Sequence, residues 1–313
     1  MLASRYRLPV IMAALVFGTV GGTVTSITQA LAAHPVAAGR PGSPSYQVPV
    51  ARPATVLHWV AGAPGPSRAE ALRIAAIRPA PLVTDAVRAG RARRSKHGLA
   101  APPLSPAMAR ANALRQAAAR SYLATAHPPA ARYLAATQRA QVRNYYCGPA
   151  TVSEMLAQLG VVLNQSAAAK ALGTNASGTD WSNKHGYPVP RVLNAHQAKN
   201  DYVAVALPWT PTAKQISTYV GDLVTDLNHG DGVPLAGNAY EVPGGPHLVG
   251  QPAGQEIMHW FDIRGYAEAG AVTAYEDSVH GAPSIAWNST VPAYSTLPSS
   301  TIVDILGARG YVW

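Results

Sequence analysis

The chain has a single cysteine, Cys147, and its neighbours are residues that thiol chemistry would use. Cys147 directly precedes a run in which apolar residues recur on one face of a predicted helix that stops at Gly160. Backbone N–H groups at a helix start are unpaired and lie at the positive end of the helix dipole, so they favour a thiolate. The amide of Gln141, upstream, could stabilise the oxyanion of an acyl-transfer reaction. These residues predict a nucleophilic thiol.

A free cysteine is also among the most buried residue types, and on its own it is more often a small hydrophobic side chain. A histidine and an aspartate downstream favour the nucleophile. Strands predicted over 257–266 and 271–277 form a hairpin, and a turn centred near Glu268 places His259 opposite Asp277. Asp277 would then accept the Nδ1–H of His259, leaving Nε2 for the thiol. The alternative is a structural bond at a sheet edge, and a register slip of one residue would separate the pair.

Other residues that could do chemistry are weaker candidates. His247 is the main rival to His259, because it also begins an apolar run. Asp222 and Asp226 lie one helical turn apart and are expected on an exposed face. With one cysteine and no paired histidines at helical spacing, we predict no metal and no cofactor. Four further histidines are expected at the surface: His185, His196, His229 and His280.

The elements that must position these residues follow an α+β order, with helices first and an antiparallel sheet after them. Two short helices are expected after the cysteine helix, the first from Ser166 to Gly173. A longer helix has Thr210 as its predicted cap, Pro211 in its first position and its end at Gly230. The predicted strands cover residues 202–206, 232–240, 257–266 and 271–277.

Residues 1–33 are typical of an export signal, with a basic start, an apolar run and small residues before the expected cleavage point. The alternative is an uncleaved membrane anchor, because the apolar run is near the length that spans a bilayer. We therefore expect a secreted protein that is extracellular or associated with the cell wall. A single cysteine leaves no intrachain disulfide, so the hydrophobic core must supply the stability.

Residues 34–130 are rich in alanine, proline and arginine and are expected to form a largely disordered basic linker or pro-segment. Residues 34–140 carry a net charge of +13, whereas residues 141–313 carry −5. The basic charge therefore lies outside the cysteine domain, which argues against nucleic-acid binding. It would suit a tether to anionic wall polymers. Helical fragments are predicted over 67–77 and 105–124, and one globular, monomeric domain over 131–313.

The motifs resemble a known family. The segment Gln-x₅-Cys-Gly-Pro-Ala-Thr, then Ala-Lys-Ala-Leu-Gly-Thr, is similar to papain-like cysteine peptidases related to the C39-like enzymes that cut double-glycine leaders of bacteriocins. The later His-Trp-Phe-Asp-Ile-Arg-Gly-Tyr and Val-Thr-Ala-Tyr-Glu-Asp are similar to the histidine and aspartate strands of that family. The resemblance covers about residues 135–280 and implies a papain-like α+β fold. It implies these roles: Cys147 as nucleophile, His259 as base, Asp277 as the residue that orients it, and Gln141 as oxyanion donor.

The sequence departs from that family in two ways. Asp277 is followed by Ser278, where the family commonly has proline. The bacteriocin processors also carry transmembrane and ATPase modules, so we expect here a stand-alone exported relative without transport-coupled cleavage. The predicted activity is thiol-dependent hydrolysis of a peptide or amide. The alternatives are acyl transfer to an amine and a catalytically silent module that binds the cell wall.

Overall fold

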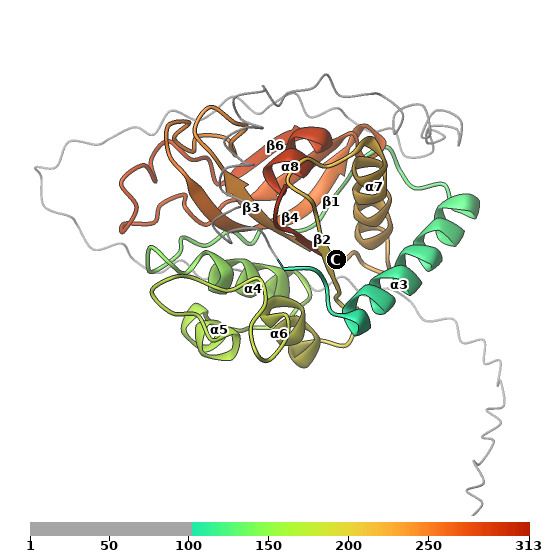
Figure 1. The fold of residues 1–313 in the computed structure, drawn as a ribbon, viewed down its shortest axis with the longest axis horizontal. Coiled ribbons are helices and arrows are strands. Elements are labelled where there is room, and N and C mark those ends of the chain that lie inside the picture. The colour runs from blue at the N-terminus through green and yellow to red at the C-terminus, as the bar shows by residue number, and fades with distance from the viewer. Residues whose placement is uncertain (1–101) are drawn as a thin grey trace, which may run out of the picture. The chain divides into compact units, whose positions relative to one another are not determined.

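The computed structural model describes residues 102–313 (Figure 1). The predicted export signal over 1–33, the helical fragment over 67–77 and most of the basic segment lie outside the described residues. Within the described part, no helix has both the length and the apolar character that a membrane crossing requires.

The centre of the fold is an antiparallel sheet of seven strands. Six of them are ordered β2 (Ala204–Ala206), β7 (Gly310–Val312), β3 (Leu235–Glu241), β4 (Ile257–Ala267), β5 (Val272–Glu276) and β6 (Tyr294–Pro298). The seventh, β1 (Arg132–Tyr133), pairs with β4, and a short 3₁₀ turn over Glu268–Gly270 joins β4 to β5. With helices packed on this sheet, the predicted α+β class is confirmed.

Three helices cover one face of the sheet: α4 (Cys147–Gln158), α5 (Gln165–Leu172) and α6 (Pro188–His196) (Figure 1). They share a core cluster in which Met155 and Leu156 of α4 pack with Trp260 of β4. Cys147 belongs to the same cluster at the start of α4. The core therefore fixes the start of this helix against the sheet.

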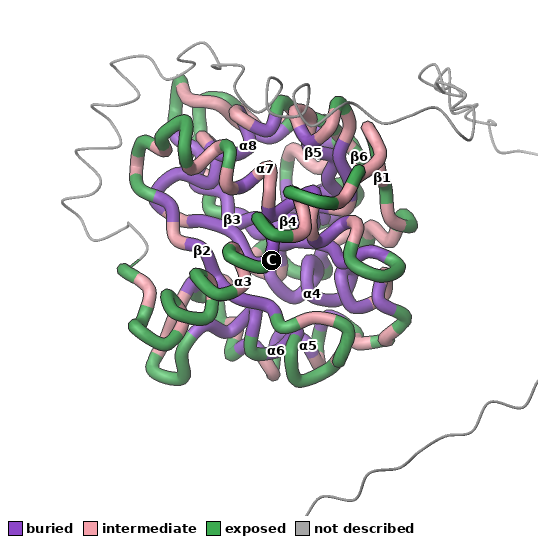
Figure 2. The backbone as a smooth tube through the Cα atoms, turned by 90° about the vertical axis from the view of Figure 1, so that its right-hand side faces the viewer, coloured by how far each residue is buried: buried purple, intermediate pink, exposed green. Residues whose placement is uncertain are grey.

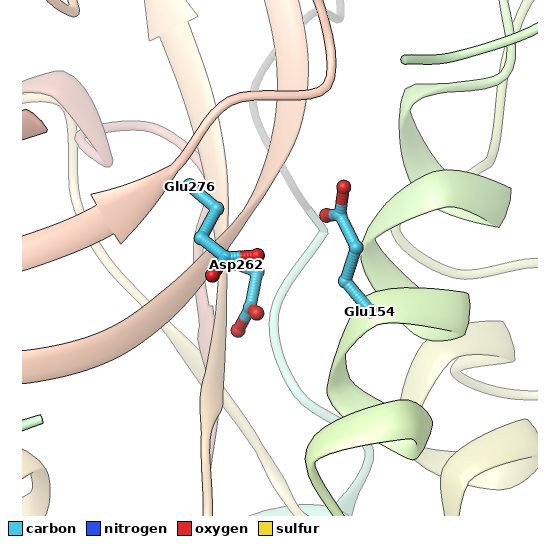
Figure 3. Close-up of side chains that lie close together, drawn as sticks. All are labelled: Glu154, Asp262 and Glu276. Carbon is cyan, nitrogen blue, oxygen red and sulfur yellow. The ribbon is translucent and has the colours of Figure 1, made fainter. Parts of the chain in front are cut away.

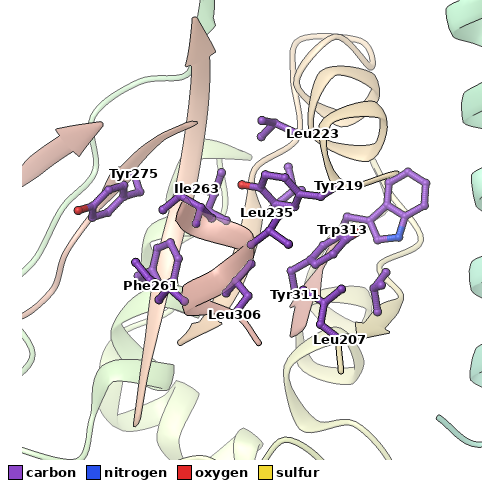
Figure 4. Close-up of a cluster of buried hydrophobic side chains, with 14 of the residues drawn as sticks. Leu207, Tyr219, Leu223, Leu235, Phe261, Ile263, Tyr275, Leu306, Tyr311 and Trp313 are labelled. Carbon is purple, nitrogen blue, oxygen red and sulfur yellow. The ribbon is translucent and has the colours of Figure 1, made fainter. Parts of the chain in front are cut away.

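The other face carries α7 (Ala213–Leu227) and α8 (Ser299–Ile305). Its cluster is rich in aromatic side chains, and Phe261, Tyr275 and Tyr311 lie together with the aliphatic residues of α7 and α8 (Figure 4). Buried residues line the sheet and the sides of the helices that pack on its two faces (Figure 2). A double core of this kind stabilises the fold without a disulfide, as expected for a chain with one cysteine.

The first described helix, α3 (Pro106–Thr125), lies in the segment expected to be linker. Its cap, Ser105, accepts from Met108 N–H, so the predicted helix over 105–124 is confirmed. The helix packs on the domain. Arg115 Nη2 lies 2.5 Å from Asp226 Oδ1, and Gln116 Nε2 donates to Asp222 Oδ2. The folded unit therefore includes residues upstream of the predicted start at residue 131.

Asp222 and Asp226 are buried, at 2% and 1% exposure, so the expectation of an exposed face was wrong. The partners that cover them come from α3 and from Tyr311, and the sequence gives no sign of these long-range contacts. Burial raises the pKa of each aspartate to about 7, against the opposing effect of these partners. Arg115 supplies the cation next to Asp226.

Two predicted helix caps were wrong by two residues each. The caps are Asn164 and Thr212, and not Ser166 and Thr210. The side chain of each true cap accepts a hydrogen bond from the backbone N–H of the residue three positions later in the sequence. Thr212 also forms a reciprocal capping box with Gln215, a spacing that Thr210 lacks.

We expect Arg115→Ala to lower the free energy of unfolding by about 2 kcal/mol, because it leaves Asp226 buried without its charged partner. Urea denaturation of the full chain measures this. Arg120→Ala, at an exposed position on the same helix, is the matched control and should lose little. Equal losses in the two variants would contradict the packing of α3 on the domain.

Candidate active site

The start of α4 places Cys147 next to the sheet. The His259 side chain and the backbone N–H groups of Gly148 and Trp260 lie close enough to its sulfur to favour the thiolate. The structure explains why residue 148 is a glycine. A Cβ there would lie 2.3 Å from Thr179 Oγ1, so only glycine lets the 179 loop approach the helix start. Thr179 O in turn accepts from the indole of Trp260, which closes the loop onto β4.

His259 and Asp277 meet, but not in the predicted register. Asp262 pairs with Glu276, whereas the predicted register placed Asp262 opposite residue 274. The shift arises because the turn is centred later than expected, so that Gly265 pairs with Ala274, three residues from its predicted partner. A bulge in β4 between Ile263 and Gly265 then moves the register back by one residue. Asp277 therefore lies just beyond the last ladder pair and reaches His259 from there, with Nε2 3.0 Å from Oδ1.

The roles of the two ring nitrogens are the reverse of the prediction. Nε2 of His259 faces Asp277, so Nδ1 is the nitrogen left for Cys147. The hydrogen bond of one ring nitrogen fixes what the other can do. With Nε2–H held by the carboxylate, Nδ1 is free to exchange a proton with the sulfur.

The charges in this group support one another within a buried site. Burial alone would raise the pKa of Cys147, but the hydrogen bond and charge of His259 and two backbone N–H groups lower it below its ordinary value. Burial would likewise lower the pKa of His259, yet the charge of Asp277 and its hydrogen bond raise it well above the usual range. The pKa of Asp277 is lowered by His259 despite burial. These directions describe a thiolate–imidazolium pair backed by a carboxylate.

Gln141 is buried on the loop before α4, at 1% exposure. Its backbone N–H donates to Ser278 O, and its Oε1 accepts from the Ser278 hydroxyl, so this loop is fixed to the residue after Asp277. Its Nε2 donates to Arg143 O at 2.8 Å. A primary amide has two N–H groups, and this bond uses one of them.

The family model for the Peptidase_C39 like family matches residues 133–292, just over half of the chain. The chain belongs to this family. The match contains Cys147, His259, Asp277 and Gln141, and membership implies cysteine-peptidase chemistry on a peptide or protein substrate. The papain-like α+β class expected from the motifs is confirmed. A comparison with curated proteins found no match.

Beside the candidate triad, this C39-like domain buries three carboxylates: Glu154 of α4, Asp262 of β4 and Glu276 of β5 (Figure 3). An oxygen from each lies within 4.8 Å of the others, and Arg264 Nε lies 3.3 Å from Glu276 Oε1. Carboxylate oxygens are ligands for hard cations, so among the described residues this is the group that could hold a metal. Burial raises the pKa of Glu154 to about 8 and that of Asp262 well above its usual range, so bound protons are enough to neutralise the cluster.

Sequence reasoning missed two residues behind Asp277. Gln251 Nε2 donates to Asp277 Oδ2 at 3.0 Å, and the indole N–H of Trp287 donates to Gln251 Oε1 at 2.7 Å. Both residues are in loops, where no periodicity marks a buried side chain. The rival His247 instead lies against two carbonyl groups of its own loop, at Gly245 and Gln255.

Glu154 predicts a pH dependence of stability. Its pKa is about 8 in the folded chain and about 4.5 ordinarily, so between these values the folded state holds a proton that the unfolded state has lost. Glu154 should therefore make the free energy of unfolding fall as pH rises, by about 1 kcal/mol per pH unit. Glu154→Gln, which keeps an oxygen for the Arg139 N–H, should make the slope shallower by that amount in urea denaturation at pH 5.5, 6.5 and 7.5, while Asp226 and Glu241, whose pKa values are also raised, retain their shares.

Glu268→Gln is the matched control, because Glu268 is exposed and should retain the wild-type slope. Parallel slopes in the wild type and Glu154→Gln would contradict a proton on this side chain.

Proposed function

We propose that this protein is an exported cysteine peptidase or amidase in which Cys147 is the nucleophile, His259 the general acid and base, and Asp277 the residue that orients the histidine. The observation that carries the proposal is the buried group in which His259 hydrogen-bonds to Asp277 and lies beside Cys147, where it lowers the pKa of the thiol. A structural role for the cysteine would not require an imidazole at hydrogen-bonding distance.

In the first step, the Cys147 thiolate attacks the carbonyl carbon of the scissile amide and forms a C–S bond. The carbonyl oxygen takes the negative charge. His259 then gives its proton from Nδ1 to the leaving nitrogen, the C–N bond breaks and a thioester remains. Asp277 stabilises the imidazolium before this transfer and keeps Nδ1 directed at the reacting atoms.

In the second step, neutral His259 takes a proton from water through Nδ1, and the hydroxide attacks the thioester. Cys147 leaves as the thiolate and the acid product is released. The backbone N–H of Cys147 and the second amide N–H of Gln141 are the proposed oxyanion donors. The bond from Ser278 fixes the Gln141 oxygen, so the amide nitrogen cannot exchange places with it without losing that bond.

The family implies a peptide or protein substrate. Two other functions use the same site. Acyl transfer would replace water by an amine in the second step. A silent module that binds the cell wall would keep the scaffold without turnover.

The proposed organisation is a signal over residues 1–33, a basic linker or pro-segment, and one monomeric cysteine-peptidase domain. The opposite net charges of +13 and −5 support a tether to anionic wall polymers through the basic part. The packing of α3 on the domain supports a tether that ends before Ser105.

Cys147→Ala and His259→Ala should each abolish release of products from a mixed peptide-amide library read by mass spectrometry. Cys147→Ala should leave the thermal midpoint nearly unchanged. His259→Ala leaves Asp277 buried without its partner, so its activity is measured well below its own, lower midpoint. His185→Ala, at an exposed histidine, is the matched control and should retain full activity. Product formation by Cys147→Ala would remove the proposal.

Added hydroxylamine separates the alternatives. A hydrolase gives mainly acid products, whereas an acyl transferase gives hydroxamates. A silent module gives neither.

A further inference from the structure

Asp277 uses both of its carboxylate oxygens, and only one of them faces the histidine. Oδ1 accepts from His259 and from the backbone N–H of Val279, at 3.0 and 2.9 Å. Oδ2 accepts from Gln251 Nε2 at 3.0 Å. A carboxylate with 1% exposure needs such donors to remain ionised.

Trp287 determines which end of the Gln251 amide faces Asp277. The indole N–H is a donor with no acceptor capacity, so the Gln251 atom 2.7 Å away must be the oxygen. The nitrogen of the amide is then directed at Asp277. Without the indole, the amide could turn and present its oxygen to the carboxylate, which would be repulsive.

The two loops that carry these side chains are held together by their backbones. Gly250, next to Gln251, has φ +81, and a Cβ there would lie 2.1 Å from Thr290 O. Thr290 Oγ1 donates to Gly250 O at 2.8 Å. The loop containing Gln251 and the loop containing Trp287 therefore meet at a fixed point behind Asp277.

We propose that Gln251 and Trp287 are positioning residues, which hold the Asp277 carboxylate in its ionised, His259-directed state and so set the pH at which the Cys147 thiolate forms. The inference rests on the proposed function of the triad. It adds two residues, from two loops, that touch neither the sulfur nor the imidazole. They act in series, because Trp287 reaches Asp277 only through Gln251.

Other titratable groups near His259 and Asp277 do not mask the influence of Asp277 on the pH at which the thiolate forms. Glu154 of α4, Glu241 of β3 and Tyr275 of β5 interact with Asp277 through their charges. Burial raises the pKa of both glutamates to about 8 and raises that of Tyr275 further, so all three are neutral at acidic pH. Below about pH 7, Asp277 is the carboxylate that balances His259.

The test is the rate of alkylation of the full chain by iodoacetamide between pH 4 and 8, which follows the thiolate fraction of its single cysteine. Gln251→Leu should move the profile to higher pH by about 0.5–1 unit, with a rate at pH 5 reduced about three- to tenfold. Trp287→Phe, which removes only the N–H, should move it in the same direction by less. The double variant should match Gln251→Leu alone, because the two residues act in series.

Gln255→Leu is the matched control. It makes the same substitution at an exposed position of the same loop and should leave the profile unchanged. The thermal midpoint of every variant is measured beside it, so that only folded protein is compared. An unchanged profile in folded Gln251→Leu, or a Trp287→Phe shift that adds fully to that of Gln251→Leu, would overturn the inference.

The wild-type profile separates this inference from the proposed function. A wild-type thiol that reacts only near pH 8 would refute the triad itself. A wild-type thiol that reacts at acidic pH, together with an unchanged Gln251→Leu profile, would refute the positioning role alone.

Discussion

The contact between a buried sulfur and a buried imidazole is the interaction on which the remainder of this site depends. Burial disfavours each charge separately, so neither a lone thiolate nor a lone imidazolium would be stable there. In the proposed ion pair each supplies the opposite charge for the other, and Asp277 would add a further negative charge on the far side of the ring. The low dielectric that penalises an isolated ion also strengthens these attractions.

The fold meets this electrostatic requirement by fixing each member from a different element. The sulfur is held by the start of α4, whose approach to the 179 loop depends on glycine at position 148. The imidazole comes from a central strand, β4, and the carboxylate from the residue after β5. Since β4 and β5 are hydrogen-bonded neighbours and α4 packs on β4, the three groups have little freedom to separate.

The local parts of this arrangement could be predicted from sequence, and the long-range parts could not. The helix after Cys147 and the strands around His259 follow from periodicity, and the family motifs pointed to the same residues. The turn near Glu268 was placed closely enough to bring His259 and Asp277 together, but its true centre lies later in the chain, so the register was wrong. The ring-nitrogen assignment failed for the same reason, because it depends on the side from which Asp277 approaches. Gln251, Trp287 and the partners of α3 are joined to the site only by tertiary contacts.

The ionisation of Cys147 is the most direct test of this account. Thiolate absorbance at 240 nm is titrated in the wild type and in His259→Ala, with Cys147→Ala subtracted as background. We predict a wild-type thiol pKa well below about 8.5, the value of a free cysteine, and a pKa at or above that value in His259→Ala, where burial acts without the imidazolium. A wild-type pKa at or above about 8.5, or one unchanged by loss of the histidine, would contradict it.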